Sequence, residues 1–100
     1  MNRDLECRAW ERLTASGQVY MHPCVLFDLI VTASVAGASI VVYDGQDATA
    51  GKLIATIEAL ANRTTVFNSV KGIPFTKGIF VTVNVNVDEV GFGYCPLIRE

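Results

Sequence analysis

The chain has 100 residues, of which 51% are hydrophobic and 18% are charged, and its formal net charge at pH 7 is −2. This length suits a single domain, and its scattered Lys and Arg residues lack the basic cluster that nucleic-acid binding requires. No run of about 20 apolar residues is present, so we expect no membrane span. Because the charged share is below the usual value of about 25%, we expect another protein chain to cover part of the apolar surface.

The N-terminal sequence MNRDLECRAWER is charged and has no apolar stretch, which argues against a signal peptide and predicts synthesis in the cytoplasm. Three cysteines cannot all pair within one chain, and a reducing compartment is the simpler explanation.

Residues 4–14 fit two secondary structures. Leu5, Ala9 and Leu13 lie on one stripe of a helix, and the same three residues lie with Cys7 on one face of a strand. We favour a strand because the segments that follow are strands. Residues 1–16 are therefore expected to form an extension or an edge strand.

Hydrophobic residues alternate along 25–33 and along 39–43, which is the period-two pattern of a strand. Ala36–Gly37 separates the two segments, and the second ends at Asp44–Gly45, a dipeptide typical of turns. Residues 52–61 fit a helix about as well as a strand, and their neighbours again favour a strand.

The clearest pattern lies near the C-terminus, in GIFVTVNVNVDEVGFGY. Residues 79–87 and 90–94 alternate on either side of Asp88–Glu89, which predicts an antiparallel hairpin. The glycines of the second segment mark a bulge or a close approach of another backbone. Upstream, 64–70 predicts a further strand, and 71–74 predicts a turn because proline cannot pair in a ladder at its own position.

Short strands separated by turn residues about every 8–12 positions are typical of a sandwich or a barrel. We therefore expect one all-β domain over residues 1–100. Its predicted architecture is an antiparallel β-sandwich of about seven to eight short strands, with jelly-roll or immunoglobulin-like topology. Residues 96–100 add an apolar C-terminal tail.

The loop from Gly45 to Lys52 is similar to a phosphate-binding loop but departs from it. A P-loop reads G-x-x-x-x-G-K-[ST], in which the lysine contacts phosphate and the hydroxyl binds Mg²⁺. Here five residues separate the glycines, Leu53 follows the lysine, and Asp47 adds negative charge. Asp44 and Asp47 are too few carboxylates for calcium, which takes about six to eight oxygen ligands. We predict a connecting turn.

Cys7, His22, Cys24 and Cys95 are the residue types that bind structural zinc. Zinc sites usually contain a closely spaced cysteine pair, which is absent, and free cysteine is commonly buried, so we favour buried thiols. No third group orients His22 toward Cys24 as a nucleophile pair requires. Adjacent carboxylates occur only at Asp88–Glu89, in an expected open turn. We predict no catalytic, cofactor-binding or metal-binding residues, and no enzyme activity.

Exposed aromatic rings can stack on sugars, although most aromatic residues of a sandwich belong to its core. The aromatic candidates are Trp10, Tyr20, Tyr43, Phe75 and Tyr94. Phe75, in an expected loop beside Pro74, is the best candidate for an exposed apolar anchor, together with the tail Pro96–Ile98.

From Gly17 to Tyr94, the order of these segments resembles small β-sandwich proteins encoded among the structural genes of tailed bacteriophages. The motifs that carry the resemblance are Tyr43–Gly45, Ile54–Ile57, Phe75–Val81 and Val90–Tyr94. The chain departs from them at His22–Cys24, where such proteins often have Gly-Pro-Gly. The resemblance implies a strand over Lys52–Glu58 and a virion component synthesised in the host bacterial cytoplasm.

The resemblance implies a non-enzymatic capsid decoration (cement) protein, or a head–tail or tail-associated subunit. Its partners would be copies of itself, as a trimer or a larger oligomer, and other virion proteins such as the major capsid protein. The predicted interface residues are Trp10, Ile73, Pro74, Phe75, Pro96, Leu97 and Ile98. The alternative is a module that binds carbohydrate or a host receptor, with Tyr43, Asp44 and Asp47 as candidate residues.

Overall fold

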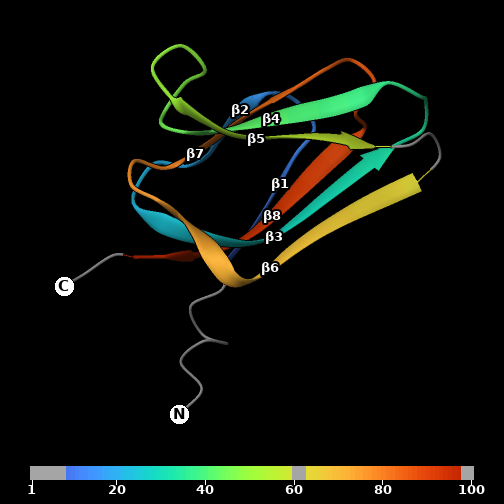
Figure 1. The fold of residues 1–100 in the computed structure, drawn as a ribbon. Coiled ribbons are helices and arrows are strands. Elements are labelled where there is room, and N and C mark those ends of the chain that lie inside the picture. Colours follow the sequence, from blue (N-terminus) through green and yellow to red (C-terminus); the bar gives the residue numbers. More distant parts are fainter. Residues whose placement is uncertain (1–8, 60–62, 98–100) are drawn as a thin grey trace.

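The computed structural model describes residues 9–59 and 63–97, which form eight strands in two sheets (Figure 1). The strands are β1 (Ala9–Leu13), β2 (Gly17–Tyr20), β3 (Cys24–Ala33), β4 (Ala38–Asp44), β5 (Lys52–Ala59), β6 (Arg63–Phe75), β7 (Ile79–Val83) and β8 (Glu89–Pro96). All pairings are antiparallel. The described residues include no helix, and so none that could cross a membrane. The prediction of an all-β sandwich of seven to eight strands is confirmed.

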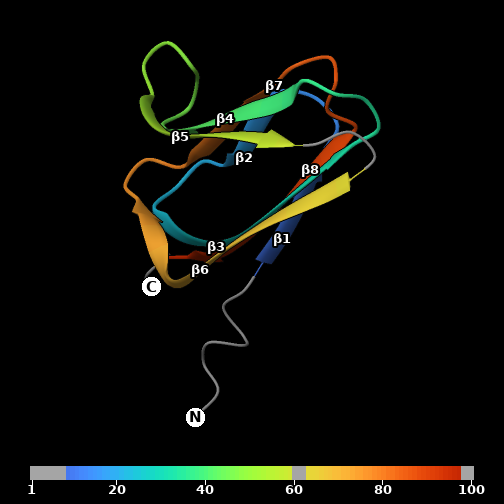
Figure 2. The same ribbon diagram turned by 45° about the vertical axis from the view of Figure 1, so that its right-hand side comes forward.

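The strand order identifies the topology as a jelly roll. One sheet has the order β1-β8-β3-β6 and the other β2-β7-β4-β5. The first strand therefore pairs with the last, the second with the seventh, the third with the sixth and the fourth with the fifth. This is one long hairpin rolled into two facing sheets (Figure 2), the arrangement of a jelly roll. An immunoglobulin domain of constant type instead divides seven strands between its sheets.

The core forms where alternating side chains of the two sheets face each other. In β3, every second residue from Leu29 to Ala33 is buried. The register shifts between Leu26 and Asp28, and the extra residue, Phe27, keeps Leu26 and Leu29 on the inner face despite their odd spacing. The largest fully buried side chains are Phe75, Phe92, Leu26, Leu29, Ile40 and Ile79. Each such burial stabilises the fold by about 1.5–3 kcal/mol relative to exposure.

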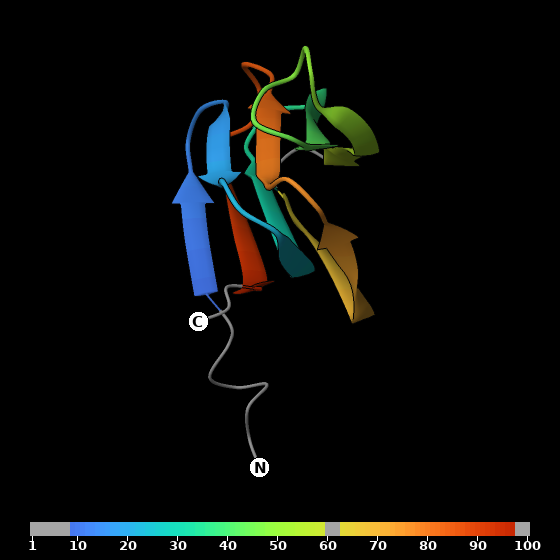
Figure 3. The ribbon, with the colours of Figure 1, turned by 90° about the vertical axis from the view of Figure 1, so that its left-hand side faces the viewer.

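The segments that fitted either a helix or a strand are strands wherever the structure describes them, at 9–13 and 52–59. Residues 4–8 and 60–61 lie outside the described residues. β1 is an edge strand, and Figure 3 shows β1 followed by β2 at one side of the sandwich. β2 was not predicted, because four residues with one buried side chain, Val19, give no clear alternation.

The predicted hairpin of residues 79–87 and 90–94 is wrong. β7 ends at Val83 and belongs to one sheet, whereas β8 belongs to the other. Residues 84–88 carry the chain between the sheets. The alternation of valines continues into this segment, but Val85 is 96% exposed, so the pattern there does not reflect a buried face.

Hydrogen bonds of Asn84 explain why β7 stops. Its side-chain Oδ1 accepts hydrogen bonds from the backbone N–H groups of Ser39 and Asn86, at 3.2 and 3.1 Å. Its Nδ2 donates to the carbonyl oxygen of Gly37 at 2.7 Å. The amide thus ties the end of β7 to the start of β4 and turns the chain away from the sheet.

The predicted turn at 71–74 is also wrong, because β6 continues through it to Phe75. Pro74 is tolerated because β6 is an edge strand. The irregularity is a bulge instead, since Leu26 pairs with Ile73 while Asp28 pairs with Asn68. Residues 69–72 of β6 therefore lie opposite a single residue of β3.

Candidate functional site

The outer face of the β1-β8-β3-β6 sheet carries a hollow of about 350 Å³, here called the Trp10 hollow. It is lined by Trp10, Glu11, Arg12, Ile30, Thr32, Glu89 and Gly91. The strand register explains its position: Gly91 lies between Arg12 and Ile30, and Gly93 lies between Trp10 and Asp28. Because glycine has no side chain, the surface is lowered along β8 while β1 and β3 form its two walls.

The two glycines of β8 have different surroundings. A Cβ atom placed on Gly93 would lie 2.9 Å from both Cζ2 and Cη2 of Trp10, so the indole lies across this glycine. Among the described residues, a Cβ atom on Gly91 would meet nothing closer than the carbonyl oxygen of Glu11, at 4.0 Å. The hollow is therefore open above Gly91, and Trp10 borders it with 56% of its surface exposed.

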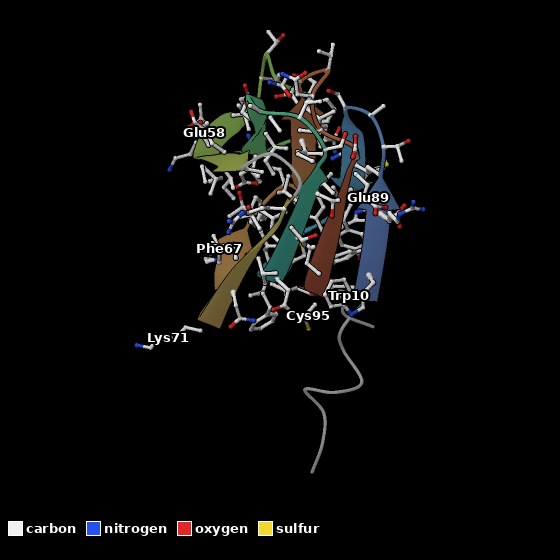
Figure 4. All side chains as sticks on the ribbon, turned by 90° about the vertical axis from the view of Figure 1, so that its right-hand side faces the viewer. Trp10, Glu58, Phe67, Lys71, Glu89 and Cys95 are labelled. Atoms are coloured by element: carbon white, nitrogen blue, oxygen red, sulfur yellow. The ribbon has the colours of Figure 1, made fainter. Side chains whose placement is uncertain are left out.

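Polar groups surround the open part of the Trp10 hollow. Nε of Arg12 donates a hydrogen bond to Oε1 of Glu89, within an ion pair that joins β1 to β8. The hydroxyl groups of Thr32 and Thr64 lie 3.4 Å apart on β3 and β6. Figure 4 shows Trp10 and Glu89 toward one edge of this sheet, with Phe67 at the other. The hollow thus combines one aromatic ring with hydrogen-bond donors and acceptors.

A second feature is the side of the sandwich where β5 and β6 are the edge strands, here called the β5/β6 side. An apolar cavity of about 200 Å³ opens between them. Its lining consists of Leu26, Leu29, Val42, Ile54, Ala55, Thr56, Ile57, Phe67 and Ile73. Phe67 pairs in register with Leu29, yet 39% of it is exposed because no strand beyond β6 covers it in the described chain.

The middle of each of these edge strands carries no charge. Residues 53–57 read LIATI and residues 64–68 read TTVFN. Leu53 and Val66 are more than half exposed. Edge strands are usually protected by short length, charged side chains or proline. An unprotected apolar edge is typical of a surface that another protein chain covers.

The structure brings part of the predicted interface together, since Pro74 and Phe75 of β6 and Pro96 of β8 flank the first residues of β3 at one end of the sheet. Trp10, Pro74 and Leu97 are exposed, Ile73 and Pro96 are partly buried, and Ile98 lies outside the described residues. Trp10 lies on β1 and Pro74 on β6, at opposite edges of one sheet. The expectation that Phe75 is an exposed anchor is wrong, since it is 1% exposed. As β6 continues past Pro74, strand alternation turns Phe75 inward, opposite Cys24.

Asp44 and Tyr43, candidates for sugar recognition, have structural contacts instead. The Asp44 carboxylate accepts hydrogen bonds from the N–H of Thr76 at 3.1 Å, from its hydroxyl at 3.1 Å, and from the N–H of Lys77 at 2.9 Å. Burial raises the pKa of Asp44, but these hydrogen bonds outweigh it and hold the pKa below its ordinary value. The ring of Tyr43 packs against Phe80 with centroids 6.4 Å apart.

The loop between β4 and β5 is the tip of the rolled hairpin, and it is a turn, as predicted. A Cβ atom on Gly45 would lie 2.6 Å from the Cα of Gly51, so the glycines let the two ends of the loop approach closely. Asp47 accepts hydrogen bonds from the N–H groups of Ala50 and Gly51, at 2.6 and 3.0 Å. These amides are therefore used within the loop.

The zinc candidates are in different environments. Cys24 is a free thiol with no exposed surface, and burial, with a smaller effect of the Asp44 charge, raises its pKa to about 12. Cys95 is disulfide-bonded, so the expectation of reduced, buried thiols is wrong for this residue, because a cysteine count does not reveal pairing. His22 is exposed, and Cys7 lies outside the described residues. Among the described residues, no three His, Cys, Asp or Glu side chains are placed to hold a metal ion.

Comparison with protein-family models, with curated proteins and with solved structures found no match for this chain. What the protein does is therefore inferred from its own residues and fold.

Proposed function

We propose that the protein is a non-enzymatic structural subunit of a tailed-bacteriophage virion, either a capsid decoration protein or a head–tail or tail-associated subunit. It acts by packing against copies of itself and against other virion proteins. The resemblance over residues 17–94 supports this proposal. The jelly roll also supports it, as an architecture of many viral capsid domains, although a fold alone does not determine function.

The observation that carries the proposal is the uncharged, apolar β5/β6 side. Phe67, Ile54 and Ile57 surround the mouth of the cavity between the sheets. Charged residues lie toward the ends of the same strands, at Lys52 and Glu58 on β5 and at Arg63 and Lys71 on β6. An apolar centre within a polar rim is the usual anatomy of a protein–protein interface.

A second copy of the chain is the occupant that best fits this side. Each copy presents two edge strands there, β5 and β6. In the described chain, each of these strands is hydrogen-bonded to a strand on one side only. Strand addition by another copy would supply backbone hydrogen bonds and would cover Phe67 and Val66 at the same time. The same contact removes an edge that would otherwise favour aggregation.

Light scattering after size-exclusion chromatography tests the assembly. We expect an oligomer for the wild-type protein and a folded monomer for Phe67→Asp, because the new charge lies at the centre of the β5/β6 side. Met21→Asp is the matched control, since Met21 is exposed on the connection between β2 and β3. A wild-type protein that stays monomeric at high concentration, or a Phe67→Asp variant that remains oligomeric, would contradict this interface.

Mass spectrometry of purified virions tests the virion assignment separately. We expect the chain to be present in particles of the phage that encodes it. Its absence from the particles, when it is produced in the infected cell, would contradict the assignment.

A further inference from the structure

We propose that the Trp10 hollow binds a neutral sugar ring. This site goes beyond the proposed assembly function, because it lies over β1 and β8, whereas the β5/β6 side begins at the opposite edge of the sheet. The sequence alone indicates Tyr43, Asp44 and Asp47 as candidate sugar-binding residues. The structure favours a different place, where an aromatic ring and polar side chains border open space.

Trp10 supplies the stacking surface. A sugar ring has a face of C–H groups, and this face packs against the flat π system of an aromatic side chain. The indole rests across Gly93, which holds it down against the sheet, and more than half of its surface is exposed beside the open space over Gly91. A side chain at either glycine would move the ring or fill the space.

Hydrogen-bonding groups line the same hollow as the indole. Arg12 offers guanidinium donors, Glu89 offers carboxylate acceptors, and Thr32 offers a hydroxyl that does both. Arg12 and Glu89 form an ion pair between β1 and β8, so their charged groups lie close together at the hollow. Ile30 completes the wall with an apolar surface. A mainly apolar hollow with a few oriented polar groups is typical of a small-molecule site.

The charges of the lining favour a neutral ligand over an anion. Glu11 and Glu89 are opposed by Arg12 alone, so the lining has a net negative charge that repels phosphate and carboxylate groups. Trp10 is the sole aromatic residue among the described lining residues, whereas cages for quaternary ammonium groups use several rings. A neutral, hydroxylated ring can stack on the indole and also form hydrogen bonds with the polar side chains.

The size of the hollow suits one ring. Its volume of about 350 Å³ is near the lower end of the range for small-molecule pockets, about 300–1,000 Å³. An oligosaccharide would place one sugar ring on Trp10, and its other rings would lie outside the hollow, along the surface of the sheet. We therefore expect weak binding, with Kd in the range of about 1 mM, which corresponds to about −4 kcal/mol.

Tryptophan fluorescence tests the proposal, because Trp10 is the only tryptophan of the chain. Glucose, galactose, N-acetylglucosamine and their β-linked disaccharides are titrated separately, with circular dichroism as a check on folding. We expect a saturable change in emission with at least one of these sugars. The same sugar is then tested on an immobilised polysaccharide that contains it, to distinguish free sugars from polymer chains as the source of the ring.

Gly91→Val is the decisive variant. Its side chain would occupy the open space over β8, since the nearest atom of the described residues to its Cβ position is the carbonyl oxygen of Glu11, at 4.0 Å. We expect the Kd to rise at least tenfold with an unchanged circular dichroism spectrum. Gly17→Ala is the matched control, since a Cβ atom there has no neighbour within 4 Å in the described part of the chain, and it should leave the Kd unchanged.

Several results would overturn the proposal. They are the absence of a saturable change with every sugar, an unchanged Kd in Gly91→Val, and saturable binding of a proline-rich peptide when all sugars are inert. A blue shift of Trp10 emission on self-association, with loss of any sugar response, would assign the hollow to a subunit contact instead. Phe67→Asp separates the two proposals, because a monomeric variant should still bind the sugar.

Discussion

The indole of Trp10 lies across the backbone of Gly93 on the neighbouring strand, where an added Cβ atom would stand 2.9 Å from two of its ring carbons. Glycine at position 93 therefore makes room for the indole of Trp10. The backbone conformation does not itself require glycine there, because the φ angle of Gly93 is not positive. This contact places the indole against the sheet beside the open part of the Trp10 hollow.

Gly93→Ala should move the indole without unfolding the protein. The nearest atoms belong to the far end of a flexible, exposed side chain, so we expect the free energy of unfolding to fall by about 1 kcal/mol. Trp10 emission should shift to longer wavelength as the ring becomes more hydrated. Gly91→Ala is the control and should leave the emission unchanged. An unchanged spectrum in Gly93→Ala would contradict the contact.

Asp44→Ala should destabilise the connection between β6 and β7. The substitution removes the acceptor of three hydrogen bonds, from two groups of Thr76 and from the N–H of Lys77. We expect a loss of about 1–3 kcal/mol in urea unfolding, because these donors are near the surface and water replaces part of the interaction. Asp47→Ala removes a carboxylate that accepts a hydrogen bond from the N–H of Ala50 in the same loop, and it should cost less.

The stability that Asp44 contributes should depend on pH. Its pKa in the folded protein is below the ordinary value of 3.8 because the hydrogen bonds outweigh the effect of burial. The contribution is therefore fully present above the pKa of the unfolded chain and is lost as pH falls through the lower folded value. Urea unfolding of the wild type and of Asp44→Asn should show stabilities that converge in acid. A difference that stays constant below pH 4 would count against these hydrogen bonds.

The sequence predicts strands well where alternation and burial coincide, as in β3 and β4. It fails at the end of β7, because Val85 continues the alternation while the side chain of Asn84 ends the strand through bonds to Ser39 and Gly37. Those partners lie more than forty residues away in the chain. A local pattern contains no information about such contacts.

In the candidate sites, too, the local sequence pattern does not reveal contacts between distant parts of the chain. The alternating glycines of β8 predicted a bulge or the close approach of another backbone, whereas the group that lies against Gly93 is the side chain of Trp10, from the other end of the chain. The sequence predicts a turn over 71–74 and therefore an exposed loop at Phe75, because proline cannot pair in a ladder at its own position. An edge strand tolerates proline, and whether a strand is an edge strand depends on the order of the whole sheet.

Gly78→Ala should be strongly destabilising, because this glycine has a φ angle of +133° and an added Cβ would overlap the carbonyl oxygen of Tyr20. Both the backbone strain and the overlap with backbone atoms resist relaxation, so we expect a loss of about 3 kcal/mol or more. Gly17→Ala is the matched control, expected to stay within about 0.5 kcal/mol of the wild type in urea unfolding. Similar losses in the two variants would show that Gly78 is not constrained in this way.

Phe75→Ala and Phe67→Ala should differ in their effect on stability, although both residues lie on β6. Phe75 is fully buried opposite Cys24, so its truncation leaves a cavity and should cost about 3–5 kcal/mol. Phe67 is 39% exposed, and its truncation should cost about 1 kcal/mol in the monomer. Thermal unfolding of dilute protein measures both. A small effect of Phe75→Ala would contradict the burial of Phe75 in the core and would support its prediction as an exposed anchor.

Cys24 should be unreactive in the folded protein. Burial, and to a smaller extent the charge of Asp44, raises the pKa of its thiol to about 12, and none of its surface is exposed. Iodoacetamide at mildly alkaline pH should therefore label Cys24 only through unfolding, and peptide mapping by mass spectrometry identifies the labelled site. Above the ordinary thiol pKa of 9.0, the unfolded chain loses this proton while the folded chain retains it, so stability should decrease as pH rises toward 12. Cys24→Ala removes this dependence, and the stability difference between wild type and variant should shrink over the same range. Rapid labelling of Cys24 under native conditions would contradict the position of this thiol in the core between the two sheets.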